Sequence, residues 1–286
     1  MRLPSLLLAA ALALPALAGR PPIPQNRWIP QPEPYRAAEA DAYMPVALSL
    51  APGLQTGLAT DDVTLLRLGI LSADYHNVGV LDLTLGYAHA SGAQRGLQLS
   101  SVGVVEGPLH GVQLSLLVSV AGLLAEAPSA GAQAALLVNY ADGLDGLQFA
   151  LLCNRSAGGT GVQVAGANFA DRLRGLQLGL VNLDGDDIRG AQIGLANAGA
   201  KRFSGLQLGA FNGGGDDFSG WQAGLLNAAV RLDGTQIGAV NLATTASGAQ
   251  IGLYNSARTL KGFQLGLLNH VENAPLPWLP FLRLAF

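Results

Sequence analysis

The chain has 286 residues, of which 50% are hydrophobic and only 12% are charged, and its formal net charge at pH 7 is −3. A chain this apolar does not stay disordered in water. The absence of a basic surplus excludes nucleic acid as a partner, because binding to phosphates requires a positively charged face. The 38 glycines, roughly twice the usual share, favour a β architecture with many tight turns.

The N-terminal region divides into two segments. An apolar run from Leu6 to Leu17 ends in the small-residue pattern of a cleavage site at Ala16 and Ala18, so residues 1–18 are predicted to be a secretory signal peptide. Residues 19–44 are rich in proline, which fixes φ and removes backbone donors, and are predicted to be an extended segment. The chain is therefore expected to be exported through the inner membrane to the periplasm, the outer membrane or the cell surface.

Residues 45–286 are predicted to form a single β-repeat domain with atypical end segments at 45–62 and 272–286. Glutamines that have a glycine two residues before them recur at spacings of 14 or 15 residues, with one spacing of 20. They are Gln98, Gln113, Gln133, Gln148, Gln163, Gln177, Gln192, Gln207, Gln222, Gln236, Gln250 and Gln264. From Gln163 onward each has an asparagine five residues later, and Arg67 and Asp82 lie roughly in phase before the series. The pattern indicates about 14 repeats.

The repeat has the alternation of a β-strand. In the unit GLQLGLVN, Leu176, Leu178 and Leu180 point to one side and Gln177 and Gly179 to the other, as in a strand with one apolar face. The glycine and the asparagine that flank the strand are read as turn residues that tolerate left-handed backbone angles. A further apolar residue two positions before the glycine is expected either to extend the strand or to form a short second one. Examples are Ile188, Phe203, Phe218, Leu232 and Leu260.

Two architectures fit a strand every 14–15 residues. The first is a parallel β-solenoid or β-roll of about 14 coils, with one repeat per coil. The alternative is an antiparallel outer-membrane β-barrel of about 16 strands, acting as a pore or an anchor, with one strand per repeat. The C-terminus favours the barrel, because Phe286 is preceded by Leu284 and Leu282 at alternate positions, as in the terminal strand of such barrels.

Recurrent amides and alternating charges favour the solenoid. Parallel stacking places like residues side by side, so that glutamines and asparagines can form hydrogen-bonded ladders. The turns also alternate in charge at the spacing of one coil, from Asp186 and Asp187 to Lys201 and Arg202 and on to the next acidic pair. In a solenoid these turns are neighbours and attract each other. The low aromatic content of 6% argues against the aromatic girdles of a membrane barrel.

The repeats resemble bacterial surface-repeat proteins of the leptospiral type, which carry tandem GLQLGLVN-like units. The resemblance covers roughly residues 45–286, is strong from Gln163 onward, and includes the run LRLGILSADYHNVGVLDLTLG from Leu66 to Gly86. It implies exposure at the cell surface or the outer membrane and implies no enzymatic activity. Combined with the regular repeat, it predicts a structural or binding scaffold with an unknown protein or glycan partner, or an association with the outer membrane.

No catalytic, cofactor-binding or metal-binding residue is predicted, and no cofactor. The acidic pairs and clusters are interpreted as solvated turn charges rather than calcium ligands. They are Asp61, Asp62, Asp184, Asp186, Asp187, Asp216 and Asp217. The four histidines, His76, His89, His110 and His270, are interpreted as turn or surface residues, and Ser100, Ser101 and Ser204 lack a base nearby in the sequence. Cys153 is expected to be a small buried side chain rather than a reactive thiol. Trp221 and Phe263 are expected to fill the core, with lipid-facing or ligand-stacking aromatics as the alternative.

Overall fold

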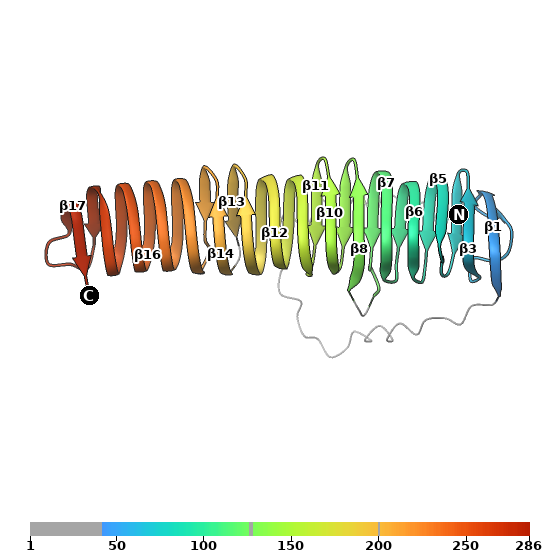
Figure 1. Cartoon of the computed structure of the whole chain (residues 1–286), viewed down its shortest axis with the longest axis horizontal. Helices are drawn as coiled ribbons and strands as arrows, with labels where there is room; N and C mark the ends of the chain where they lie inside the picture. The colour runs from blue at the N-terminus through green and yellow to red at the C-terminus, as the bar shows by residue number, and fades with distance from the viewer. Residues whose placement is uncertain (1–41, 126–127, 200) are drawn as a thin grey trace, which may run out of the picture. The chain divides into compact units, whose positions relative to one another are not determined.

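The computed structural model describes residues 42–125, 128–199 and 201–286 of the chain. The predicted signal peptide (1–18) and nearly all of the proline-rich segment (19–44) lie outside these residues. The described residues wind into a stack of coils that forms a rod (Figure 1). Their strands are β1 (Tyr43–Ala51), β2 (Leu54–Gln55), β3 (Asp62–Gly69), β4 (Ser72–Tyr75), β5 (Leu81–Ala90), β6 (Gln94–Val105), β7 (Leu109–Ala121), β8 (Ser129–Ala135), β9 (Val138–Ala141), β10 (Leu144–Ala150), β11 (Cys153–Ser156), β12 (Thr160–Ile193), β13 (Ala196–Gly199), β14 (Arg202–Leu208), β15 (Phe211–Gly213), β16 (Asp217–Val271) and β17 (Trp278–Ala285).

Neighbouring coils pair in parallel and in register. Gln207, for example, pairs with Gln192 on one side and with Gln222 on the other. Within the described ranges, only β2 on β1 and β17 on β16 pair antiparallel, and both lie at an end of the stack. The parallel solenoid is therefore confirmed, and the antiparallel barrel is wrong, because a barrel of consecutive strands would reverse direction at every repeat.

The glutamine column begins with two charged residues. Arg67 pairs with Asp82, and Asp82 pairs with Gln98, so both occupy the glutamine position of their coils, as their phase in the sequence predicts. Twelve coils with glutamine follow, ending at Gln264. The one spacing of 20 residues is accommodated between Gln113 and Gln133, which still pair directly.

Each coil consists of two strand segments that face each other across a thin interior. In one coil these segments are β14, which contains Gln207, and β15, which contains Asn212. Side-chain amides span the gap between the segments: Gln222 Nε2 donates to the main-chain oxygen of Ala228 at 3.3 Å, and Asn212 Nδ2 donates to that of Ala223 at 3.0 Å. The chain turns between the two segments within about two residues, which produces a sharp edge.

The stacked glutamines form a continuous hydrogen-bonded ladder. Each glutamine from Gln113 to Gln264 donates from Nε2 to the Oε1 of the glutamine in the coil before it, at 2.7–3.0 Å. These side chains are at most 2% exposed. A buried amide without a partner would be costly, so stacking is the arrangement that makes this polar interior stable.

The asparagines form a second ladder that donates in the opposite direction. Each asparagine from Asn139 to Asn255 donates from Nδ2 to the Oδ1 of the asparagine in the following coil, at 2.8–3.0 Å. Asn139 and Asn154 lie six residues after their glutamines rather than five, so the sequence pattern does not include them. The interpretation of the asparagines as left-handed turn residues is wrong, because they lie in strands and are buried.

Both ends of the glutamine ladder meet a charged side chain. At the first coils, Gln98 Nε2 donates to Asp82 Oδ2 at 2.8 Å, and Asp82 forms a fully buried ion pair with Arg67. At the last coil, β17 folds back so that Arg283 pairs in register with Gln264. Among the described residues, two buried atoms at this end lack a hydrogen-bond partner: the acceptor Gln264 Oε1 and the donor Arg283 Nε. The ladder thus ends against an acceptor at one end and a donor at the other.

Two columns of glycine allow the coils to pack this closely. The glycine two residues before each glutamine has a positive φ in most coils, such as +131° at Gly220, and a Cβ there would overlap the carbonyl oxygen of the previous coil. The glycine two residues after the glutamine makes room for the asparagine ladder. A Cβ on Gly224 would lie 2.7 Å from Asn212 Nδ2 and would also overlap the carbonyl oxygen of Gly209.

The apolar residues two positions before the glycine extend the first strand and fill the core. Ile188, Phe203, Phe218, Leu232 and Leu260 belong to one buried cluster that covers the C-terminal half of the rod. The rings of Phe203 and Phe218 stack with centroids 5.1 Å apart. A second buried cluster, between residues 47 and 121, fills the N-terminal coils. The core therefore lies beside the amide ladders, near the turns that connect one coil to the next.

Candidate functional site

The leucines of the repeat face outward, at the sharp edge between the two strand segments. The strand alternation is confirmed, but the amides and glycines face the interior and the leucines face solvent. We call this row the leucine edge. It consists of Leu85, Leu116, Leu136, Leu151, Leu180, Leu195, Leu225, Leu253 and Leu267, each 48–74% exposed. Main-chain hydrogen bonds link its rungs directly, such as Leu151 N to Leu136 O at 3.1 Å.

Both flanks of the leucine edge are also apolar. On the glutamine side, Phe149, Trp221 and Leu265 are exposed, and on the asparagine side Leu137 and Phe211 are exposed. The expectation that Trp221 and Phe263 fill the core is wrong: Trp221 is 59% exposed and Phe263 37%. Both precede an inward-facing glutamine, so alternation directs them outward.

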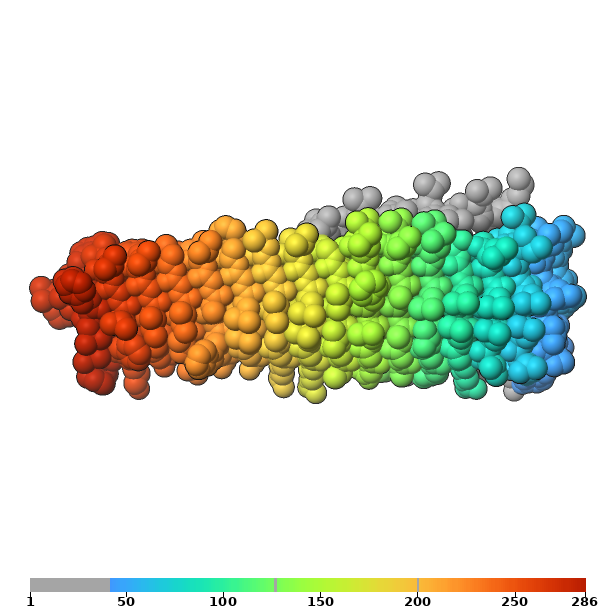
Figure 2. All heavy atoms as spheres, turned by 45° about the horizontal axis from the view of Figure 1, so that its top comes forward, coloured from blue at the N-terminus to red at the C-terminus, as the bar shows by residue number. Residues whose placement is uncertain are grey.

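Charged residues are confined to the other half of each coil. In all twelve glutamine coils, the residue before the glutamine and the five residues after it include no Asp, Glu, Lys or Arg. The charges lie in the turns that connect coils and in the strand residues next to those turns. The rod thus has an uncharged side along the leucine edge and an opposite charged edge, along the connecting turns (Figure 2 shows the stacked coils as spheres).

Ion pairs between neighbouring coils neutralise much of the charged edge. Lys201 Nζ lies 2.7 Å from Asp186 Oδ1, and Arg202 Nη2 lies 3.4 Å from Asp187 Oδ2. Arg231 pairs in the same way with Asp217. The predicted attraction between turns that alternate in charge is therefore confirmed. Such exposed pairs contribute little stability each, so they serve mainly to balance charge along the edge.

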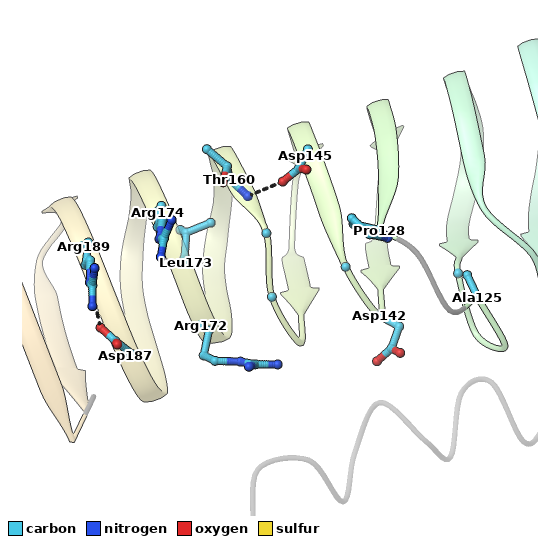
Figure 3. Close-up of a pocket in the computed structure, with 14 residues that line it drawn as sticks. Ala125, Pro128, Asp142, Asp145, Thr160, Arg172, Leu173, Arg174, Asp187 and Arg189 are labelled. Carbon is cyan, nitrogen blue, oxygen red and sulfur yellow. Dashed lines mark hydrogen bonds and ion pairs between the residues drawn. The ribbon is translucent and has the colours of Figure 1, made fainter.

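A hollow of about 450 Å³ opens on the charged edge between the two core clusters (Figure 3). It arises where Gly159 occupies the position that carries Leu144 and Leu173 in the adjacent coils, so that a core side chain is missing. Its charged lining is balanced and consists of Asp142, Asp145, Asp187, Arg172, Arg174 and Arg189. Asp145 already accepts from Thr160 N at 2.8 Å, and Asp187 Oδ1 lies 3.5 Å from Arg189 Nε. The hollow therefore has no net preference for an anion or a cation.

His89 lies between the carboxylates of two neighbouring coils. Its Nδ1 lies 2.7 Å from Asp74 Oδ1 and its Nε2 lies 3.3 Å from Glu106 Oε1, in the coils on either side. Burial acts to lower the pKa of His89, but hydrogen bonds to the two carboxylates outweigh it and raise the pKa to about 9. The imidazolium thus links three coils at neutral pH.

Other sequence-predicted positions differ in burial from the expectation: His76 is more buried, and Cys153, expected to be buried, is less so. His76 is buried, with Nδ1 3.2 Å from Ser91 Oγ, so the expectation of a turn or surface residue is wrong for it. His270 is half-buried, and its ring packs 4.2 Å from that of Trp278. Cys153 is half-buried on the outer side, and burial raises the pKa of its thiol.

Among the acidic residues, Asp61 is buried, and Asp184 points inward, where Gln177 donates to it at 2.9 Å, so the interpretation as solvated turn charges is wrong for these two. Burial raises the pKa of Asp184 to about 7, although this hydrogen bond opposes the shift. Across residues 42–125, 128–199 and 201–286, no three His, Cys, Asp or Glu side chains are grouped so that they could hold a metal ion. In these same ranges, no helix is long and apolar enough to cross a bilayer.

The chain was compared with known protein families, proteins and structures, and only its own repeat serves to classify it. No protein-family model, no curated protein and no solved structure matches the chain. The resemblance to leptospiral-type surface-repeat proteins therefore gains no support from a matched family or homologue. What the sequence and the structure show together is a parallel β-solenoid repeat protein with stacked glutamine and asparagine ladders.

Proposed function

We propose that the chain is an exported, non-enzymatic repeat protein that acts as a rigid scaffold and binds its partner along its length. The observation that carries this proposal is the repetition of one outward surface through twelve coils, with its charges confined to one edge. A partner that recognises such a surface meets the same chemistry every 4.8 Å or so. A catalytic centre, in contrast, needs a few convergent groups at one place.

The location is proposed from the sequence. The leader at 1–18 supports export, and the leptospiral-type resemblance supports the cell surface, with the periplasm as the other compartment. A partner that is a protein, a glycan or the outer membrane is compatible with an uncharged surface, whereas a nucleic acid is not.

Fractionation of a bacterial host that expresses the full chain with a C-terminal tag tests the export. We expect a mature protein that begins at Gly19 and is absent from the cytoplasm. A matched variant with Ala16→Arg and Ala18→Arg should keep the leader attached, because signal peptidase requires small residues there. Wild-type protein that stays in the cytoplasm with its N-terminus intact would refute export.

Scattering and activity measurements on the purified mature chain test the scaffold. A rigid solenoid should give an elongated particle, whose length changes little with salt because the ladders hold it together rather than surface charges. We expect no depolymerisation of any polysaccharide in a panel of bacterial and plant glycans. Release of reducing ends from any of them would refute the non-enzymatic scaffold.

A further inference from the structure

The leucine edge presents a solvent-exposed apolar ridge along the whole glutamine ladder. Its nine leucines are spread over about 55–60 Å of the rod, taking 4.8 Å per coil, and Figures 1 and 2 show the coils stacked without a bend. The intervening rungs carry Ser101, Gly166, Ala210 and Ala239, which are small and uncharged. Soluble monomers rarely expose a continuous apolar surface of this extent, so the ridge indicates a binding surface.

The shape of the ridge determines what can cover it. A second copy of the chain that lay flat on the glutamine side would find only two apolar outward columns, represented by Trp221 and Ala223 in one coil, because the next outward column back from the edge is polar or charged in most coils, as at Ser219. That apolar strip is about 7 Å wide and gives roughly 400 Å² of apolar contact, about half of the 800 Å² per partner in a typical stable interface. It would also leave the leucines and the asparagine side exposed. A fluid apolar phase covers a convex ridge on both flanks at once.

The charge distribution permits insertion to the depth that an interfacial protein reaches. Elements that lie in the membrane interface bury their apolar face by about 5–10 Å. The Asp, Glu, Lys, Arg and His side chains nearest to the edge along a strand, such as Arg155 and His89, lie three residues or more back from it, which is about 10 Å. The leucines and the first outward residues of each flank can therefore enter the acyl region while every charge stays in water or among the headgroups.

The backbone N–H and C=O groups at the leucine edge are hydrogen-bonded, as an apolar solvent requires. An unpaired N–H or C=O group is expensive in lipid. Here the corner residues bond to the neighbouring coils, for example Leu195 N to Leu180 O at 2.9 Å and Leu225 N to Ala210 O at 3.0 Å. The polar amides lie inside the coil, where the ladders satisfy them. The ridge thus presents side-chain hydrocarbon and no unpaired ladder edge.

We propose that the rod lies flat on a lipid bilayer with its leucine edge inserted into the outer part of the acyl layer. The inference rests on the proposed scaffold function, because it names the partner of the scaffold's repeated surface. Since the ridge has no cationic residue beside it, attachment depends on apolar burial and not on anionic headgroups.

Sedimentation with unilamellar phosphatidylcholine vesicles tests the proposal on the mature full chain. We expect wild-type protein to sediment with these vesicles, with no more than a twofold gain when 30% phosphatidylglycerol is added or a twofold loss in 0.5 M NaCl. The test variant carries Leu195→Glu, Leu225→Glu and Leu253→Glu, and the matched control carries Ser204→Glu, Thr244→Glu and Thr259→Glu. All six positions are exposed, and both variants change the net charge by the same amount.

The test variant should lose vesicle binding by about 100-fold or more, and the control should bind within about twofold of wild type. A variant with alanine at the same three leucines keeps the charge unchanged and should lose roughly 10–100-fold. Circular dichroism checks that each variant keeps its β structure. The alanine variant keeps the test decisive if the charged variant does not fold.

Three results would overturn the inference. The first is wild-type protein that stays in the supernatant, the second is equal loss in the test and control variants, and the third is binding only to anionic vesicles. A wild-type dimer that ignores vesicles and dissociates in the alanine variant would assign the ridge to a second copy instead. Because export and the absence of enzymatic activity are measured without lipid, failure here leaves the proposed scaffold standing, whereas a cytoplasmic chain would remove the scaffold proposal itself.

Discussion

Replacing one glutamine in the middle of the ladder should destabilise the rod through orphaned amides. Gln222 donates to Gln207 Oε1 at 2.8 Å and accepts from Gln236 Nε2 at 2.7 Å. Leucine at position 222 has a similar volume but neither donates nor accepts. The change Gln222→Leu therefore leaves an unpaired acceptor in the coil before it and takes an acceptor away from the coil after it.

The size of the effect follows from counting those groups. Each buried polar group left without its partner costs about 1–3 kcal/mol, so two give about 2–6 kcal/mol. Gln222 and Gln264 each also donate to one main-chain oxygen, so that loss is common to the two variants. Within the ladder, Gln264→Leu at its end orphans only the Oε1 of Gln250, because no glutamine follows it. The end substitution should therefore cost about 1–3 kcal/mol, roughly half as much.

Hydrogen exchange resolved by mass spectrometry suits this comparison, because a solenoid opens one region at a time and is not described by a single global free energy of unfolding. Peptides from the coils around position 222 should lose protection in the first variant and those near position 264 in the second. Urea titrations followed by circular dichroism give the total loss. Equal losses for the two substitutions, or a loss below about 1 kcal/mol at position 222, would refute the ladder reasoning.

Three further predictions concern space and protonation. Gly224→Ala should lower the free energy of unfolding by about 2–3 kcal/mol, because the new Cβ overlaps the preceding coil. Gly213→Ala should change it by no more than about 0.5 kcal/mol, because the nearest atom to its Cβ is 3.6 Å away. Urea titrations compare the two variants, and equal losses of stability would contradict the packing argument. The raised pKa of Asp184, about 7, means that the folded state holds its proton more tightly, so stability should fall by about 3–4 kcal/mol between pH 4 and pH 7. Asp184→Asn should remove that slope from stability profiles measured against pH, and an unchanged slope would rule out Asp184 as its source. The pKa of His89, also raised, to about 9, gives stability that is complete below pH 6.5 and is lost as the pH rises to 9. His89→Gln should abolish that loss in the same measurement, and a persisting loss between pH 6.5 and 9 would argue against it.

The architecture could be predicted from the sequence because the solenoid repeats its chemistry at the spacing of its coils. Glutamines every 14 or 15 residues and turns that alternate in charge, such as Asp187 and Arg202, make sense only if successive repeats are parallel neighbours. The phase of Arg67 and Asp82 likewise located the first rungs of the ladder. These are local signals with a direct physical counterpart in the stack.

The identity of the inward face could not be predicted with the same rule. Alternation separates Leu180 from Gln177 but does not say which of them faces the interior, and the usual burial of apolar residues suggests the leucine. The amides occupy the interior because stacking supplies a hydrogen-bond partner for each of them, and this property of the assembled coils is not visible in a single repeat. Trp221 was misassigned for the same reason. Asn154 was missed because one extra residue at the corner of its coil shifts it from five to six positions after the glutamine.

The opposite directions of the two amide ladders bear on how long such a rod can grow. Each side-chain amide has a dipole along the rod axis, and a long series pointing one way would build up partial charges at its ends, as peptide groups do in a helix. The glutamine amides point their N–H groups toward the N-terminus and the asparagine amides toward the C-terminus, so the two series cancel wherever both are present. Only the coils before Asn139 have an uncompensated series, and these coils lie next to the Asp82 carboxylate, which accepts at their positive end. Adding repeats that carry both amides therefore lengthens the rod with no growing electrostatic penalty, so duplication of the unit can extend it freely.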